Sequence, residues 1–276
     1  MAVGKEEIQG IKSEGTFYRI HEEIPSIKST PLFDIGPFTI ANTTTTMVLI
    51  VFIVSLLVYF IKKAKVPGTF QNLMELFYES VLSFVTQVVG NQEQAKKIVP
   101  FVGSLLTFLI IANILPLMPL VSAFYTLDHT MLFRGVTTDF NTTFALALTV
   151  VLLMQIIGVR SQGFFSYLSH FVQIKQVIEG FKKGIGAGMV SIVNFFVGLI
   201  EIVAELSKIL SLSLRLFGNM FAHEVLTVIL LGAFAYGVPA LWMGMGLLVG
   251  VVQSLVFVAL VTVYFSLVTK KHGDGH

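Results

Sequence analysis

The chain has 276 residues, of which 55% are apolar and 12% are charged, and its mean hydropathy is +0.84. These values leave little room for a soluble protein and favour a chain embedded in a membrane. The net charge of +2 gives no reason to expect a nucleic-acid partner, and the absence of cysteine excludes disulfide bonds.

The first 40 residues are charged and polar, and they contain no short apolar core followed by a small-residue cleavage site. We therefore expect an external N-terminal tail over residues 1–40 and no cleaved signal peptide. An uncharged apolar run over residues 41–61 predicts the first membrane span, which the KKAKVPG segment ends. Residues 41–270 are expected to form a single membrane domain, followed by a cytoplasmic tail over residues 271–276.

Residues 70–90 show a different pattern, in which apolar residues recur at the spacing of one face of a helix. The residues between them are polar or acidic and include Gln71, Glu75, Glu79 and Gln87. This one-sided apolar stripe predicts an amphipathic helix that lies in the cytoplasmic interface of the membrane. A short sixth span is the alternative, but it would bury two glutamates.

Further spans complete the predicted fold, which is an all-α membrane protein with five transmembrane helices and one interfacial amphipathic helix. They are expected over residues 100–124, 138–159 and about 185–230, with the last span following a turn near residues 232–239. Pro116 and Pro119 interrupt the second span, and Asp139 stands where a cap of the third is expected.

The distribution of lysine and arginine sets the orientation of these spans. With five spans, most basic residues outside the tail fall in loops on one side, whereas the short loops on the other side hold only Arg134. The positive-inside rule then places the C-terminus in the cytoplasm and the N-terminal tail outside. The basic residues of the tail itself weaken this count.

Arg215 is the only charged residue between positions 209 and 222, inside a long apolar run. A guanidinium stays protonated, and placing it near the middle of a bilayer costs at least about 2.5–3.5 kcal/mol. At about 100° per residue, several polar residues fall within about 40° of it and form one stripe: Glu201, Lys208, Ser211 and Asn219. Such a stripe suits a helix that faces a partner or a water path. Pairing of Arg215 with a carboxylate on a neighbouring helix is the alternative.

Acidic residues flank this cation on both sides along the helix. At about 1.5 Å per residue, Glu201 lies roughly 20 Å to the cytoplasmic side of Arg215 and Glu224 roughly 13 Å to the outer side. Carboxylates and the neighbouring imidazole of His223 exchange protons readily, whereas a guanidinium does not. This order predicts two proton-accessible ends separated by a barrier, and it disfavours a single straight pore.

The segment SLSLRLFGNMFAHE, at residues 211–224, resembles the signature of the F-type ATP synthase subunit a family. Four other segments are similar to the same family: VPGTFQNLMEL at 66–76, ANILPLMP at 112–119, TTDFNTTFALAL at 137–148 and VTVYFSLV at 261–268. The arginine segment is highly specific and the others are moderately so. The resemblance covers about residues 40–270 and leaves the N-terminal tail unmatched.

The resemblance implies a membrane stator subunit with no catalytic site, cofactor or metal of its own. It implies a long, tilted hairpin of the last two helices beside a ring of c-subunit proteolipids, with two offset half-channels for protons. Arg215 matches the arginine that draws the c-ring carboxylate into its ionised form and blocks a leak between the half-channels. The implied partners are the c-ring, the peripheral-stalk b subunits, other synthase subunits and membrane lipid. The implied location is the inner (plasma) membrane of a bacterium.

Other roles in that family carry over one residue at a time. Glu224 matches the outer half-channel carboxylate. His223 stands where some members carry glycine, and Gly246 stands where some carry histidine, so we expect one imidazole supplied from either of two facing helices. The remaining matches are the polar residues near the arginine, Asn219 and Gln253, and the cytoplasmic-side residues Glu201 and Tyr264.

One departure from the family pattern is Pro116, because some members carry an acidic residue there. Asp128, His129 and Asp139 are the candidates to supply that acidity. The coupling ion, H⁺ or Na⁺, is decided mostly by the c-ring, which is not in this chain.

Other function classes fit this sequence less well. A cation–proton antiporter would show internal repeats and paired broken helices, which we do not find. An intramembrane metalloprotease would need a second histidine four residues after His223, where Thr227 stands. An ion-pair cluster around Glu205 and Lys208, which can pair at i,i+3, stays open as a structural alternative to a transport role for Glu201.

Overall fold

The computed structural model describes residues 29–35, 38–63, 68–118, 124, 131–163, 185–234 and 237–270. Five helices in this part of the chain are long and apolar enough to cross a membrane, which confirms the predicted all-α membrane class. They are α1 (Asn42–Lys63), α3 (Gln92–Ile114), α5 (Phe140–Gln162), α8 (Ile185–Ala233) and α9 (Gly237–Lys270). The chain is a multi-pass membrane protein.

A small antiparallel hairpin precedes the first span, in the segment that we expected to be an external tail. Its strands are β1 (Pro31–Ile35) and β2 (Phe38–Ala41), and they are paired with Phe33 opposite Ile40. Residues 1–28 lie outside the described residues, so the N-terminal tail as a whole stays a prediction.

The second span begins earlier than the sequence indicated. We expected it to start at Pro100, but α3 begins at Gln92 because the Asn91 side chain caps it, accepting hydrogen bonds from the N–H groups of Glu93 at 2.9 Å and Gln94 at 3.3 Å. Pro100 therefore lies inside the helix. The helix ends before Pro116, which lies in the 3₁₀ turn η1 (Leu115–Leu117).

The amphipathic segment forms α2 (Thr69–Val89), which is not among the five candidate spans. Val81, Val85 and Val89 recur every four residues, and this buried face packs against α3 and α9. The helix ends at Gly90, whose φ of 77° is a left-handed conformation that glycine adopts without strain. The placement of α2 in the membrane interface stays a prediction.

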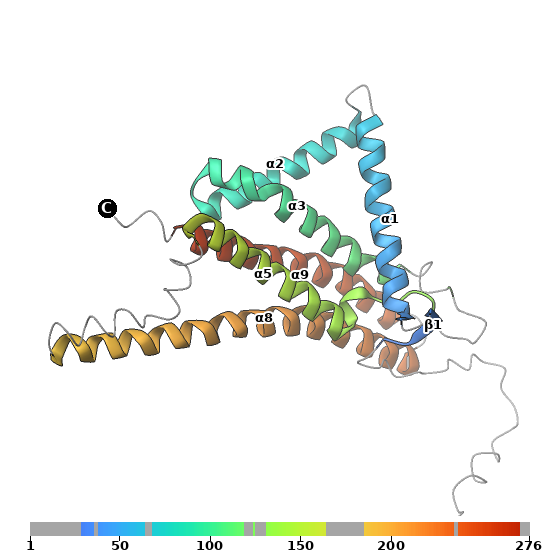
Figure 1. Ribbon diagram of the computed structural model, residues 1–276. Coiled ribbons are helices and arrows are strands. Elements are labelled where there is room, and N and C mark those ends of the chain that lie inside the picture. The colour runs from blue at the N-terminus through green and yellow to red at the C-terminus, as the bar shows by residue number, and fades with distance from the viewer. Residues whose placement is uncertain are drawn as a thin grey trace, which may run out of the picture.

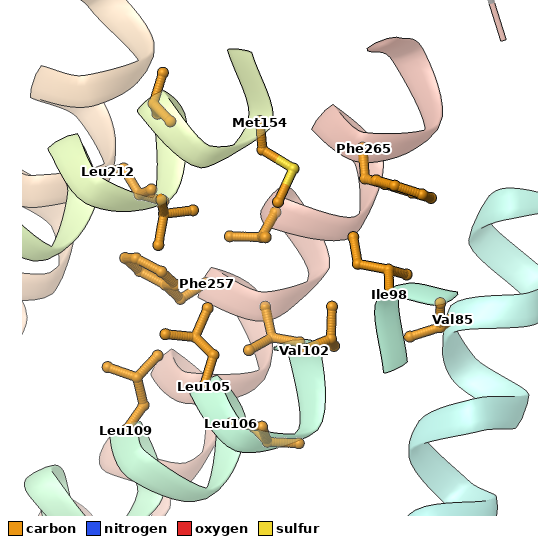
Figure 2. Packing of buried hydrophobic residues seen from close by; sticks show 14 of the residues in the cluster. Val85, Ile98, Val102, Leu105, Leu106, Leu109, Met154, Leu212, Phe257 and Phe265 are labelled. Carbon is orange, nitrogen blue, oxygen red and sulfur yellow. The ribbon is translucent and has the colours of Figure 1, made fainter. Parts of the chain in front are cut away.

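The core lies where α2, α3, α5, α8 and α9 meet (Figure 1). Figure 2 shows Phe257 of α9 pointing toward Leu105 and Leu109 of α3 and toward Leu212 of α8. Phe257 is fully buried and Leu212 is 1% exposed. Because these contacts join helices far apart in sequence, they set the relative rotation of α8 and α9 and hence the direction in which each side chain of α8 points.

Helix α8 is longer than a membrane requires. Its 49 residues span about 74 Å at 1.5 Å per residue, which is more than twice the thickness of a hydrocarbon core of about 30 Å. Its first half extends beyond the other helices (Figure 1) and exposes large apolar side chains, among them Val193, Phe196 and Ile200. Helix α9, with 34 residues, is also longer than the hydrocarbon core, so the tilted hairpin expected from the family resemblance stays a prediction.

Candidate functional site

Arg215 lies on the exposed side of α8, between the buried residues Leu212 and Leu216. Among the described residues, no carboxylate forms an ion pair with its guanidinium. The alternative in which Arg215 pairs with a carboxylate on a neighbouring helix is therefore wrong for this part of the chain. Ser211 and Asn219, one turn away on either side, are exposed as well, so this part of the polar stripe faces outward from the helix bundle.

Asn219 connects the arginine face to α9. Its Nδ2 donates a hydrogen bond to Oε1 of Gln253 at 2.7 Å. Gln253 is 4% exposed, and its own Nε2 has no hydrogen-bond partner in the described part of the chain. A buried amide donor of this kind is a group that an ordered water can satisfy.

Toward the C-terminal end of α8 from Arg215, Glu224 binds Arg134 through two hydrogen bonds. Arg134 Nε donates to Oε1 at 3.2 Å and Nη2 donates to Oε2 at 3.3 Å. The arginine side chain is 7% exposed and the glutamate 27%, so the pair is largely shielded from its surroundings. A bidentate ion pair of this geometry fixes the orientation of the Glu224 carboxylate.

The start of α1 holds the loop that carries Arg134. The Arg134 backbone N–H donates to Oγ1 of Thr46 at 3.1 Å, and Oγ1 of Thr45 donates to the carbonyl of Leu132 at 2.6 Å. Our sequence reasoning missed the role of Arg134. The available signal was that Arg134 is the only lysine or arginine in the short loops on its side of the predicted spans.

His223 occupies the space that Gly246 leaves open on α9. The imidazole is 7% exposed and stacks on Trp242, with ring centroids 5.4 Å apart and an interplanar angle of 20°. Its Nε2 has no hydrogen-bond partner among the described residues. A Cβ at Gly246 would come within 2.5 Å of Cε1 of His223, so the expectation that these positions face each other is confirmed.

The other alternative for His223 was a zinc ligand of a protease. Position 227, where the second histidine would stand, carries a threonine whose Oγ1 donates to the His223 carbonyl at 2.7 Å within the same helix. In the described part of the chain, no group of three or more His, Asp or Glu side chains is arranged to hold a metal ion.

Toward the N-terminal end of α8 from Arg215, Glu205 is the centre of a second polar cluster. Gln155 Nε2 of α5 donates to Oε2 of Glu205 at 2.7 Å, and Lys208 Nζ binds Oε1. The Lys208 ammonium lies 5.0 Å from the centroid of the Tyr264 ring on α9. The i,i+3 pairing of Glu205 with Lys208 is confirmed, and Glu201 lies half-buried one helical turn earlier.

Asn113 is the centre of a buried network between α3, α9 and η2 (Val136–Thr138). Its Nδ2 donates to the Gly250 carbonyl and to Oγ of Ser254, both at 3.1 Å, and its Oδ1 accepts a bond from Thr137 Oγ1 at 2.9 Å. All three of these partners of its side chain lie at least 24 residues away in sequence. No local pattern in the sequence predicts this network, because its members lie far apart along the chain.

Two of the candidates to replace the acidity absent at Pro116, Asp128 and His129, lie outside the described residues. The third, Asp139, is 3% exposed and caps α5 by accepting a hydrogen bond from the Asn141 N–H at 3.0 Å. The predicted capping role is confirmed. The carboxylate also accepts a bond from Thr43 Oγ1 at 3.4 Å, which ties it to α1.

Comparisons with known proteins bear on this arrangement. The profile of the ATP synthase A chain family matches residues 42–266. The chain is 31% identical over 240 residues to an ATP synthase subunit a of Protochlamydia amoebophila, covering 82% of this chain and 80% of that protein. It is 33% identical over 199 residues to the ATP synthase subunit a of Geobacter sulfurreducens, covering 72% and 74%. It is 26% identical over 242 residues to that of Moorella thermoacetica, covering 87% and 96%.

Proposed function

Because the chain belongs to the ATP synthase A chain family, we propose that it carries protons across the membrane beside the rotating c-ring. Its work is to couple proton flow to rotation and thereby to ATP synthesis elsewhere in the complex. Each proton that crosses 100 mV delivers about 2.3 kcal/mol, so a leak past the ring would dissipate the driving force. The c-ring proteolipids, the peripheral-stalk b subunits, other synthase subunits and lipid are its partners.

The observation that carries this proposal is that the Arg215 side chain is exposed on a helix long enough to span a membrane. In the described part of the chain, no anion forms an ion pair with it. A cation at membrane depth is costly unless a partner or water compensates it. A carboxylate on the c-ring, passing this face of α8, is the compensating group that the proposal supplies. It also explains why the side chain points away from the helix bundle.

In this proposal, protons in the outer half-channel pass Glu224 and His223 before they reach the c-ring. Two buried polar nitrogens without partners in the described chain, Nε2 of His223 and Nε2 of Gln253, suit a path that contains water. Asn219 holds the Gln253 amide, and the Arg134 guanidinium orients the Glu224 carboxylate.

Protons leave the ring through the inner half-channel, which lies on the other side of Arg215 near Glu201 and Tyr264. A guanidinium between the two half-channels repels protons, so a proton reaches the inner side by riding on the ring.

In this proposal the chain lies in the plasma membrane of a bacterium, with the N-terminus outside and the C-terminus in the cytoplasm. The positive-inside count supports this orientation.

Replacing Arg215 with alanine tests the proposal. In inverted membrane vesicles, we expect Arg215→Ala to abolish ATP-driven proton pumping while the c-ring still co-purifies with the chain. Arg160→Ala is the matched control, because Arg160 is also exposed but lies in the last turn of α5. Normal pumping by the Arg215 variant, or purification of the chain without a ring of small proteolipids, would contradict the proposal.

A further inference from the structure

Lys208 lies on nearly the same face of α8 as Arg215. The two residues are seven apart, which places them about 20° apart around the helix and about 10 Å apart along it. They are the only lysine and arginine of α8, whose whole length the structure describes. A second free cation this close to Arg215 would compete for any carboxylate that passes this face.

The surroundings of Lys208 remove that competition. Its ammonium pairs with Glu205 and lies 5.0 Å from the centroid of the Tyr264 ring, a distance typical of a cation–π contact. The lysine and glutamate side chains are only 28% and 22% exposed. The charge of Lys208 is thus balanced by its neighbour, and its side chain is drawn toward α9.

Gln155 fixes the other half of this arrangement. Its Nε2 donates to Oε2 of Glu205 at 2.7 Å from the neighbouring helix α5, while Lys208 takes Oε1. Each carboxylate oxygen therefore has its own partner, so the Glu205 carboxylate cannot turn away from Lys208 without losing a hydrogen bond.

We propose that Gln155 and Glu205 form a clamp that neutralises Lys208 and holds it against Tyr264, so that Arg215 is the single uncompensated cation on this face of α8. The inference rests on the proposed function. Gln155 and Glu205 are positioning residues that act through Lys208 and take no proton themselves. A released ammonium would repel protons leaving toward the cytoplasm and would hold the ring carboxylate at a second position.

A charge-rescue experiment tests the clamp. We expect Glu205→Gln to lower the rate of ATP-driven proton pumping in inverted vesicles about tenfold. This is the order of the rate change caused by one uncompensated unit charge about 10 Å away at an effective dielectric constant of about 20. Adding Lys208→Gln to it should restore pumping to within about twofold of the unmodified complex, because the stray charge is then gone. Glu79→Gln, an exposed glutamate on α2, is the control and should pump normally.

Two results would overturn the clamp. The first is unchanged pumping by Glu205→Gln. The second is a double variant as slow as Glu205→Gln alone, which would indicate that the Glu205 carboxylate itself carries protons. If Glu205→Gln does not assemble, Gln155→Leu gives the same test without changing a charge. It should slow pumping, and Lys208→Gln should reverse the effect. Arg215→Ala in the same vesicles separates the two proposals. If it still pumps, the proposed function fails, whereas if it is inactive and rescue is absent, only the clamp fails.

Discussion

The contact between His223 and position 246 makes the sharpest prediction from this structure. Changing Gly246 to alanine would place a Cβ 2.5 Å from Cε1 and 3.0 Å from Cδ2 of His223, and still closer to Nε2. Ordinary contacts between such atoms are about 3.5–4.0 Å, so the imidazole has to shift by about 1 Å or more. Trp242 stacks on the ring and restricts that movement. We therefore expect a loss of stability in the range of overpacked cores, about 1–3 kcal/mol.

Heating the detergent-solubilised complex and measuring the fraction of the chain that stays soluble is a suitable assay. Gly246→Ala should lower the midpoint temperature. Gly244→Ala, on the same helix with no atom within 4 Å of the added Cβ, should not. Combining Gly246→Ala with His223→Ala should recover most of the loss, because the space is reopened. Equal midpoints for the Gly246 and Gly244 variants would refute the close contact and with it the rotation of α9 against α8.

The remaining predictions concern the polar groups around Glu224 and Asn113. Glu224→Gln should slow proton flux through the membrane sector, and an unchanged flux would remove Glu224 from the path. Arg134→Met leaves the Glu224 carboxylate without its cation, and we expect it to destabilise the fold by about 3 kcal/mol. This value is the lower end of the range for broken buried ion pairs, because the glutamate side chain is 27% exposed. Double substitution with Glu224→Gln should cost less than Arg134→Met alone in the same heating assay, and an equal cost would argue against a coupled pair. Asn113→Leu breaks three hydrogen bonds and leaves Thr137 Oγ1 without its acceptor, which should cost about 1–3 kcal/mol, whereas Asn72→Leu on the exposed surface of α2 should be nearly neutral.

Several features followed from the sequence because their causes are local. Apolar runs of about 20 residues predicted the five helices of membrane-spanning length, and a one-sided stripe predicted α2, since both patterns depend on residues within one helix. The same holds for the cap at Asp139 and the pairing of Glu205 with Lys208, which lie three residues apart. The start of α3 was missed because Pro100 was taken as a boundary, although the cap at Asn91 begins the helix eight residues earlier.

The partners of these side chains in other helices were decided by tertiary structure. Arg134 meets Glu224 across 90 residues, Gln155 meets Glu205 across 50, and Asn113 meets Ser254 across 141. Helical periodicity determines which residues share a face, but not the direction that the face takes once helices pack. That rotation depends on how Phe257, Leu212 and Leu109 fit together, and it turns Arg215 outward while His223 and Glu205 point toward neighbouring helices. The sequence by itself therefore determined the spans and the charged stripe, and packing decided what each charge meets.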